Sequence, residues 1–441
     1  MRKAASLLAF TLACADSDDG GHLTGLDATS AEVSAPGDSD SPDTRGVGTG
    51  EDASVLVDSS ASDVAEPLPD ASAPVDTAAD GVAPGEDAGT PGCEWLPPQH
   101  TRVVMISKPY SESGGKADAW ETRALLQDGA LGEAQAFTMS RAVSGVVAFR
   151  HDGGLAAAVD DHGEIHLIAL TATGVATPGP TVDPELVYAQ TAAFAPDGLS
   201  LIAVDPNWPE NGGGLFRVSV GCEGDVGEVT ALTPSKLALT ALPLGDRWVV
   251  PGRGVGSGPE GQVHLVGADG ALLASAKVFP DTDDILASAT LTADRRFVLV
   301  GDHSEFSGLP NRIGVARIDG DTLEALAPVT PVLDPVALVA SPLGDSVLVV
   351  SGYGNAVRVV GYSADAEVPF VDLGEPEYLG ASPALPGDAV LVPGEDPVVL
   401  VVENVAVRSF RFVPGGVVDL GASPTGSGFT AIPGAIGVQP L

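Results

Sequence analysis

A unit of 43 to 50 residues recurs through the C-terminal part of the chain, and this repeat constrains the fold more than any other feature. In each unit a turn rich in Pro, Asp or Gly precedes four or five Val, Leu, Ile or Ala residues, as in residues 194–204. One turn residue per unit serves as a ruler, at Gly153, Gly198, Gly245, Arg295, Gly344, Gly387 and Gly434. Short β-branched runs between turn residues are typical of strands. The repeat therefore predicts an all-β protein made of equivalent units.

Seven such units predict a β-propeller, in which seven four-stranded blades stack radially. A single hairpin cannot bury both of its faces, whereas radial stacking of units of this length does. In the second unit we expect strands at 191–194, 199–204, 214–220 and 226–232. A β-sandwich array and a β-helix are the alternatives, but a β-helix repeat is shorter and a sandwich needs no regular unit.

The last unit is incomplete, and this predicts how the ring closes. We expect two strands of the last blade within 435–441 and its other two at the other end of the domain, at 101–107 and 122–127. A ring closed by strands from both termini has no open edge that could pair with another molecule. The propeller domain is therefore expected at residues 94–441.

A family resemblance rests on residues 341–357, SPLGDSVLVVSGYGNAV, which are similar to the YVTN-type repeat of lactonase-like, WD40-like bacterial propellers. Residues 195–204 and 292–300 match the first half of this repeat, although Leu343 stands where Asp is usual. The resemblance implies a seven-bladed propeller. It also implies lactone hydrolysis as one activity, which would need acidic and histidine side chains converging on the central channel.

The N-terminus has the pattern of an export signal. Arg2 and Lys3 precede ten uncharged, mostly apolar residues, which is too short to span a bilayer as a helix. The residues before Cys14 resemble a bacterial lipobox, so we expect residues 1–13 to be a lipoprotein signal peptide and Cys14 to be lipidated. The resemblance implies an address at the outer membrane or cell surface. Ordinary signal-peptidase cleavage at the small-x-small site Ala13-Cys14-Ala15, giving a secreted or periplasmic protein, is the alternative.

Residues 14–93 have the composition of an acidic tether. From Ala15 to Gly92 the chain contains 18 Asp and Glu, one Arg and no aromatic residue. Such a segment cannot bury enough apolar surface to offset the entropy of ordering, and its charges repel one another. We expect a disordered linker that lifts the propeller off a lipid surface.

Charge excludes several classes of partner. With 21 basic and 60 acidic residues the formal net charge is −39, whereas proteins that bind nucleic acid need clustered positive charge. The chain also lacks the repeated apolar runs of about 20 residues that a polytopic membrane protein needs. We therefore expect no nucleic-acid partner, a membrane contact only through the lipid anchor, and a monomer.

The candidate binding surface is a set of loops that follow the second strands. Those of blades two to four are long, at 205–213, 252–261 and 301–311, whereas those of blades five and six are expected to be short, at 352–355 and 394–396. Adjacent long loops on a rigid scaffold are typical of binding sites, although solvated turns are the alternative. The candidate residues are Trp208, Glu210, Arg253, His303, Glu305 and Phe306, and from blade one Asp160, Asp161, His162 and Glu164.

Signatures of catalysis are sparse. The sequence contains no Gly-x-Ser-x-Gly motif and no phosphate-binding Gly-rich turn. We therefore expect a binding module for a cell-envelope protein, a peptide or a glycan, with a lactonase-like hydrolase and a purely structural surface protein as alternatives. We expect no cofactor and no metal site, because the acidic run 160–164, which could bind a structural cation such as calcium, reads more simply as a solvated turn.

Cys93 and Cys222 remain once Cys14 is lipidated or removed. In an oxidising compartment two such cysteines can form a disulfide that fastens the start of the domain to its second blade. The sequence leaves this pairing open, because Cys93 precedes the first expected strand.

Overall fold

The computed structural model describes residues 93, 95, 102–111, 116–139, 143–160, 163–182, 189, 191–205, 214–233, 240–252, 262–280, 286–302, 312–329, 334–352, 354–374, 377–379, 386–425, 431–432 and 434–440. All of them belong to the unit Thr90–Leu441, to which the description below is limited. The signal peptide, Cys14 and nearly all of the proposed tether lie outside the described residues. Among the described residues no helix is long and apolar enough to cross a membrane.

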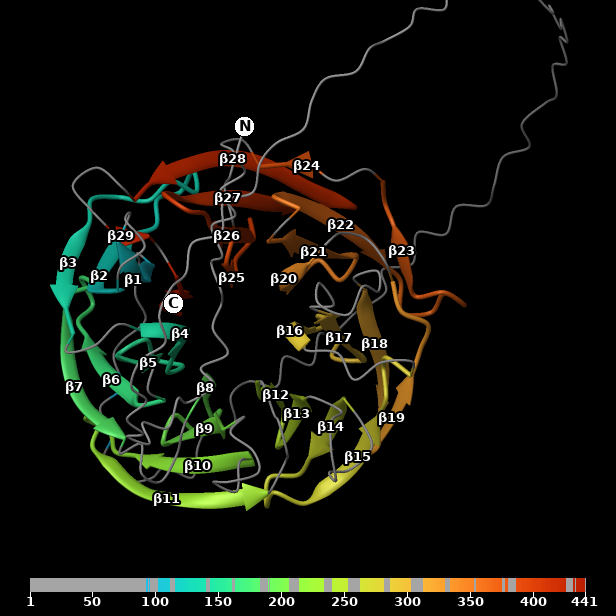
Figure 1. The fold of residues 1–441 in the computed structure, drawn as a ribbon, viewed down its shortest axis with the longest axis horizontal. Coiled ribbons are helices and arrows are strands. Elements are labelled where there is room, and N and C mark those ends of the chain that lie inside the picture. The colour runs from blue at the N-terminus through green and yellow to red at the C-terminus, as the bar shows by residue number, and fades with distance from the viewer. Residues whose placement is uncertain are drawn as a thin grey trace, which may run out of the picture. The chain divides into compact units, whose positions relative to one another are not determined.

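The described residues form seven antiparallel blades around a central axis, so the predicted all-β propeller is confirmed (Figure 1). Blade one consists of β4 (Val143–Phe149), β5 (Leu155–Asp160), β6 (Ile165–Leu170) and β7 (Ala176–Val182). Blade two consists of β8 (Thr191–Phe194), β9 (Ser200–Asp205), β10 (Gly214–Val220) and β11 (Val226–Thr233). Blade three consists of β12 (Leu242–Leu244), β13 (Arg247–Pro251), β14 (Val263–Val266) and β15 (Leu272–Ala276). The strands of the second blade lie within a residue or two of the ranges expected from the sequence.

The remaining four blades complete the ring. Blade four consists of β16 (Leu286–Leu291), β17 (Phe297–Asp302), β18 (Ile313–Asp319) and β19 (Thr322–Ala325), and blade five of β20 (Pro335–Ala340), β21 (Ser346–Ser351), β22 (Ala356–Tyr362) and β23 (Phe370–Asp372) with β24 (Glu377–Tyr378). Blade six consists of β25 (Asp388–Val392), β26 (Val398–Val402), β27 (Ala406–Val413) and β28 (Gly416–Pro424). The last sheet consists of β1 (Val103–Ser111), β2 (Lys116–Ala124) and β3 (Gln135–Thr138) with β29 (Ala431–Ile432) and β30 (Ile436–Val438). The last group is blade seven, in which N-terminal and C-terminal strands pair.

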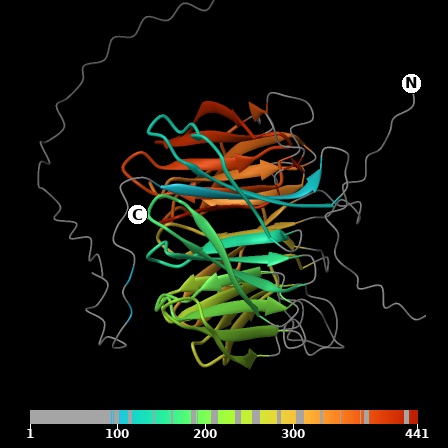
Figure 2. The ribbon, with the colours of Figure 1, turned by 90° about the vertical axis from the view of Figure 1, so that its left-hand side faces the viewer.

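The strands run between two faces of the ring, which Figure 2 shows edge-on. We call the face with the first-to-second and third-to-outer strand turns, such as 150–154 and 171–175, the turn face. We call the opposite face, with the second-to-third strand connections such as 161–164, the loop face. Every blade therefore presents equivalent chain positions on the same face.

The ruler residues of the first five units occupy one backbone conformation at the turn face. Their φ angles are positive, from 58° to 74°, at Gly153, Gly198, Gly245, Arg295 and Gly344. This left-handed region favours glycine, which explains why four of the five are Gly. The turn residue was therefore a valid ruler for blades one to five.

The last two ruler residues were misplaced. Gly387 directly precedes β25, and the equivalent turn of blade six lies between β25 and β26, at 393–397. Residues 394–396 consequently lie on the turn face, and the short loop of blade six on the loop face is 403–405. Gly434 lies between β29 and β30, both on the inner edge of blade seven. In both places a Pro-Gly pair lies just before an inner strand. In blades one to five the ruler turn lies just after the inner strand, and the two kinds of turn have a similar sequence.

Blade seven closes the ring with strands from both termini, as expected, but with a different division. The N-terminal segment supplies three strands, β1, β2 and β3, and the C-terminal segment supplies the inner edge as β29 and β30, which both pair with β1. The sequence had predicted two strands from each end. The additional N-terminal strand, β3, has four residues that are largely exposed and show no hydrophobic run, so no pattern in the sequence marks it.

The core lies between the blades. All six residues of β5 are buried, and its alternate side chains face opposite neighbours. Leu155, Ala157 and Val159 pack with blade two, whereas Ala156 and Ala158 pack with blade seven. Because both faces of a second strand are buried, these strands read as continuous apolar runs without the alternation of a half-exposed strand.

A disulfide joins the start of the domain to blade two, which resolves the pairing left open above. Cys93 is bonded to Cys222, with their Cα atoms 5.2 Å apart. Two residues on, the Trp95 ring packs edge-on against His151 (centroids 4.9 Å apart) and beneath the Arg150 guanidinium, 4.8 Å from the ring centroid. Arg150 also donates to the Cys222 carbonyl oxygen (2.8 Å). The N-terminal segment is therefore fastened to the turn face of blades one and two.

Candidate functional site

Most of the predicted loop residues lie outside the described residues. This applies to Trp208, Glu210, Arg253, His303, Glu305 and Phe306 on blades two to four, and to Asp161 and His162 on blade one. The described strand ends β9, β13 and β17 show that the three long loops leave the loop face, as expected. Asp160 and Glu164 are the two predicted site residues whose side chains the structure describes.

Asp160 and Glu164 meet a histidine that the sequence analysis left out of the site, His166. The Asp160 Oδ2 atom lies 2.9 Å from His166 Nε2, and Glu164 Oε2 lies 3.9 Å from the same nitrogen. The side chains of Asp160 and His166 are 0% and 5% exposed, and that of Glu164 is 18% exposed. A buried carboxylate–imidazole pair with a second carboxylate beside it therefore lies at the loop face of blade one.

The local fold holds this cluster in place. Asp160 is the last residue of β5 and His166 the second of β6, so the hairpin brings them together across its connecting turn. The Asp160 Oδ1 atom accepts the Glu164 backbone N–H (3.0 Å), and the Asp160 N–H donates to the Glu164 carbonyl oxygen (3.0 Å). The Asp160 carboxylate thus holds the turn through Oδ1 and orients the His166 imidazole through Oδ2.

The same three residues are the only cluster of potential metal ligands found among the described residues. One ligand atom from each of Asp160, Glu164 and His166 lies within 4.8 Å of the others. Two carboxylates and an imidazole suit zinc or another divalent transition metal better than calcium, which prefers six to eight oxygen ligands. The hydrogen bond between Asp160 and His166 also satisfies this arrangement without a metal.

Buried carboxylates recur at the equivalent position in other blades. Asp160, Asp205 and Asp302 each lie seven residues after the left-handed turn residue of their unit, and they are 4%, 2% and 0% exposed. A buried carboxylate is costly unless it is paired or hydrogen-bonded. Asp302 lies 3.6 Å from Arg312 Nε, and the Arg312 guanidinium lies over the Phe279 ring. Each such aspartate therefore marks the root of a loop on the loop face.

Blade five carries its buried carboxylate on a different segment. Asp334, 1% exposed, directly precedes β20 and has a φ of 53°, an uncommon conformation for a residue other than glycine. A side chain at Gly352 would lie 2.7 Å from Asp334 Oδ2, so only glycine fits beside it. Backbone strain of this kind clusters at functional sites, and here too it falls on the loop face.

Asp388 is the one ionisable residue on the described inner strands, which line the central axis. Its carboxylate accepts the backbone N–H groups of Ala389 (2.8 Å) and Ile436 (3.1 Å). Burial raises the pKa of Asp388 to about 6, and these two hydrogen bonds oppose the shift. In the part of the chain that the structure describes, the acidic and histidine side chains expected for a central site therefore do not converge on the axis.

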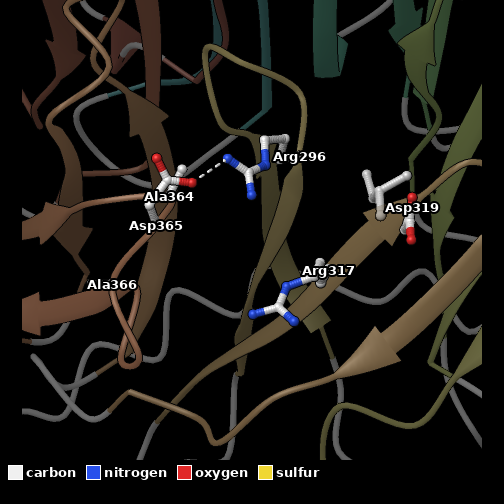
Figure 3. Close-up of a pocket in the computed structure, with 7 residues that line it drawn as sticks. Arg296, Arg317, Asp319, Ala364, Asp365 and Ala366 are labelled. Carbon is white, nitrogen blue, oxygen red and sulfur yellow. Dashed lines mark hydrogen bonds and ion pairs between the residues drawn. The ribbon is translucent and has the colours of Figure 1, made fainter.

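A shallow pocket on the turn face between blades four and five has a different chemistry. It has a volume of about 440 Å³ and contains the side chains of Arg296, Arg317, Asp319 and Asp365 (Figure 3). Arg296 points toward Asp365 and donates to it (3.0 Å), and Arg317 donates to Glu324 (3.0 Å). Both guanidinium groups are thus paired with carboxylates, which offsets their positive charge.

Comparison with known structures shows the same fold in several solved proteins. A proposed 6-phosphogluconolactonase from Bacteroides uniformis superimposes with a TM-score of 0.57 at 12% identity, covering 77% of this chain and 100% of that one. The periplasmic gluconolactonase of Pseudomonas aeruginosa gives 0.56 at 17% identity, covering 77% and 99%. A proposed 6-phosphogluconolactonase from Bacteroides fragilis gives 0.58 at 12%, covering 77% and 98%.

Sequence comparison adds no closer relationship. No protein-family model matches the chain, and no curated protein sequence is significantly similar to it. At 12–17% identity, the structural likeness establishes the fold and leaves the activity open.

Proposed function

We propose that this propeller hydrolyses a lactone at the cluster of Asp160, Glu164 and His166. The observation that carries the proposal is the 2.9 Å contact between the buried Asp160 Oδ2 and His166 Nε2. The likeness to lactonase-like propellers supports the same reaction class over the binding module expected from the sequence.

The pair provides the parts of a general base. If the Nε2–H donates to Asp160, the carboxylate fixes the tautomer and orientation of the ring and leaves Nδ1 free to accept a proton. His166 Nδ1 would take a proton from water as its oxygen attacks the lactone carbonyl, and would return it to the ring oxygen as the C–O bond breaks. The product is a hydroxy acid, so atoms and charge balance. Glu164, the most exposed of the three, would stabilise the imidazolium and meet the substrate first.

A metal-dependent version of the reaction uses the same residues. A divalent ion held by Asp160, Glu164 and His166 would polarise the carbonyl and activate water. A screen of γ- and δ-lactones with and without chelator distinguishes the two versions, because only the metal-dependent one loses turnover on chelation. Asp160→Asn should lower turnover in both. A protein that hydrolyses none of the lactones, or an Asp160→Asn variant as active as the wild type, would refute the proposal.

A second candidate is the binding module for a cell-envelope protein, a peptide or a glycan. The supporting observation is that two of the long loops start directly at buried carboxylates, Asp205 and Asp302. Shortening residues 206–213 and 303–311 to Gly-Ser linkers should leave the fold intact and abolish capture of a partner from envelope extract. Equal capture by the shortened protein would contradict binding at these loops, and no saturable capture by either protein would favour the structural alternative.

We also propose that the chain is exported as a monomer and anchored through Cys14 at the outer membrane or cell surface. The disulfide between Cys93 and Cys222 supports export, because disulfides form and persist in oxidising compartments. Mass spectrometry of the mature N-terminus tests the anchor. A diacylated or triacylated Cys14 is expected, whereas an unmodified N-terminus at Ala15 or beyond would show ordinary secretion.

A further inference from the structure

The pocket between blades four and five on the turn face has charged groups of both signs, and they come from three segments of the chain. Arg317 and Asp319 lie at the end of β18. Arg296 lies in the turn between β16 and β17, and Asp365 lies in the turn between β22 and β23. Figure 3 shows both guanidinium groups in the space between the two blades, where a ligand can reach them.

The alternation of side chains along β18 explains why an arginine and an aspartate share one wall. Successive side chains of a strand point to opposite faces, so the odd-numbered residues from Ile313 to Asp319 lie on the same face. Ile313 and Val315 are buried against blade five, and Arg317 and Asp319 continue the same row beyond the core. Two strand rises, roughly 7 Å, separate the Cα atoms of these last two residues. This wall of the pocket therefore carries a cation and an anion at a fixed spacing.

The two arginines leave backbone positions that are held in place, and their charged ends remain accessible. Asp294 accepts the Tyr362 hydroxyl through Oδ2 (2.6 Å) and the Arg296 backbone N–H through Oδ1 (3.2 Å), which braces the turn against blade five. The Arg317 guanidinium lies 5.6 Å from the centroid of the Phe297 ring, within the range of a cation–π contact. The side chains of Arg296 and Arg317 are 48% and 38% exposed.

Both guanidinium groups have donors to spare. Arg296 donates through Nη1 to Asp365, and Arg317 donates through Nη1 to Glu324. Among the described residues the other side-chain N–H groups of the two arginines have no acceptor, and the Asp319 carboxylate has no donor. The side chain of Asp365 is 92% exposed, and exposed ion pairs contribute little stability. The carboxylate of a ligand can therefore displace Asp365 from Arg296.

Charge decides which kind of ligand this pocket favours. A free anion is repelled by a chain with a formal net charge of −39, and a free cation meets two guanidinium groups in the pocket. A zwitterion avoids both costs, because it brings a carboxylate for the arginines and an ammonium group for Asp319. The guanidinium fork also matches the geometry of a carboxylate.

We propose that this pocket binds a dipeptide with free ends, with its carboxylate held by Arg296 and Arg317 and its ammonium group held by Asp319. The charges of a dipeptide are separated by its peptide unit, which suits groups two residues apart on a strand better than the one-carbon separation in a free amino acid. The volume of about 440 Å³ lies within the range of small-ligand pockets, and Ala364 and Ala366 in its lining leave room for small side chains. This site is independent of the proposed hydrolytic cluster, which lies on the loop face.

Alanyl-alanine and its two end-blocked forms test the proposal. N-acetyl-alanyl-alanine lacks the ammonium group, and alanyl-alanine amide lacks the carboxylate. In NMR titrations of the full chain we expect alanyl-alanine to shift the methyl resonances of Ala364 and Ala366 saturably and to bind at least tenfold more tightly than either blocked peptide. The absence of a saturable shift, or equal binding of the three peptides, would overturn the proposal.

Substitutions at exposed positions assign each charge without disturbing the core. Arg296→Gln should weaken the binding of alanyl-alanine about tenfold. Arg295→Gln removes the same charge one residue earlier, at an exposed position outside the pocket lining, so it is the matched control and should keep the wild-type affinity. Asp319→Asn should bind the acetylated and the free peptide equally. The proposal also fails if the two arginine variants behave alike, or if Asp319→Asn still prefers the free ammonium group.

Discussion

Ser107 and Ala435, which lie 328 positions apart, are joined by reciprocal hydrogen bonds. The Ala435 N–H donates to Ser107 Oγ (2.9 Å), and the Ser107 N–H donates to the Ala435 carbonyl oxygen (2.9 Å). Gly434 donates in turn to the Ser107 carbonyl oxygen (2.9 Å). These contacts lie between β29 and β30, where the inner edge of blade seven is interrupted, and they hold that edge to β1.

The first prediction concerns this closure. Ser107→Ala leaves the buried Ala435 N–H without its acceptor, which should lower the free energy of unfolding by about 1–3 kcal/mol. Urea titration measures the change. Ser219→Ala, an exposed serine on β10, should leave the midpoint unchanged. An equal effect of both substitutions would show that the Ser107 hydroxyl has no special role in closing the ring.

The second prediction concerns the disulfide. Its two cysteines are separated by 129 positions, so the Cys93→Ser, Cys222→Ser double variant should lose about 2–5 kcal/mol of stability. Denaturation with and without reductant measures the loss. Reductant should destabilise the wild type and leave the double variant unaffected, and insensitivity of the wild type to reductant would contradict the fastening role.

The third prediction concerns a buried ion pair in blade seven. Lys108 Nζ lies 3.1 Å from Glu121 Oε2 with both side chains fully buried, and Glu121 also binds Arg123 (2.8 Å). Glu121→Gln leaves two cations facing a neutral amide and should destabilise the fold more than Lys108→Met, which leaves Glu121 paired with Arg123. Thermal unfolding of the two variants compares them. A larger loss for Lys108→Met would show that the ammonium is the more important partner.

The fourth prediction concerns the dependence of stability on pH. Burial lowers the pKa of His264 to about 4, and its Nδ1 lies 2.8 Å from Ser275 Oγ. Because the unfolded chain binds this proton at a pKa near 6.5, folding becomes less favourable as pH falls from about 6.5 to 4, by up to about 3 kcal/mol. His264→Gln should remove this loss, as measured by urea midpoints at pH 7 and 4.5. The same loss in the variant would assign it to other groups.

Asp388 changes the free energy of unfolding with pH in the opposite direction over nearly the same pH range. Burial raises its pKa in the folded state to about 6 from 3.8, so the native state holds the proton more tightly than the unfolded chain does. The stability that this proton contributes is therefore lost as pH rises from about 4 to 6. Asp388→Asn should therefore make the acid sensitivity of the protein steeper. An unchanged or shallower profile by the same urea measurement would contradict the raised pKa.

The fold could be predicted because each unit carries its own local signals. The left-handed turn residue and the run after it, as in Gly198 and β9, mark the first two strands of a blade. The positions of Gly387 and Gly434 within their blades were predicted wrongly, because in both places a Pro-Gly pair precedes an inner strand. It also missed β3, because an outer strand with one face in solvent needs few apolar residues.

The candidate site could be predicted only in part. Asp160 and Glu164 were noted for their acidity, but His166 was not placed with them, because the sequence does not show the register of the β5–β6 hairpin. Asp160, Asp205 and Asp302 each follow the ruler turn of their own unit by seven residues, and this recurrence in three units was present in the sequence and would have indicated buried carboxylates. Asp334 reaches its position through a backbone conformation that no local pattern reveals.

The most direct test of the proposed function compares two histidines that occupy the same place in different blades. His166 and His264 are each the second residue of a third strand and both are buried, but among the described residues only His166 contacts a carboxylate. The measurement is the rate of lactone hydrolysis, with the best substrate of the screen, by His166→Gln and His264→Gln. Our account predicts that His166→Gln lowers the rate at least a hundredfold, the usual contribution of a general base, and that His264→Gln keeps it. Equal rates for the two variants would contradict it.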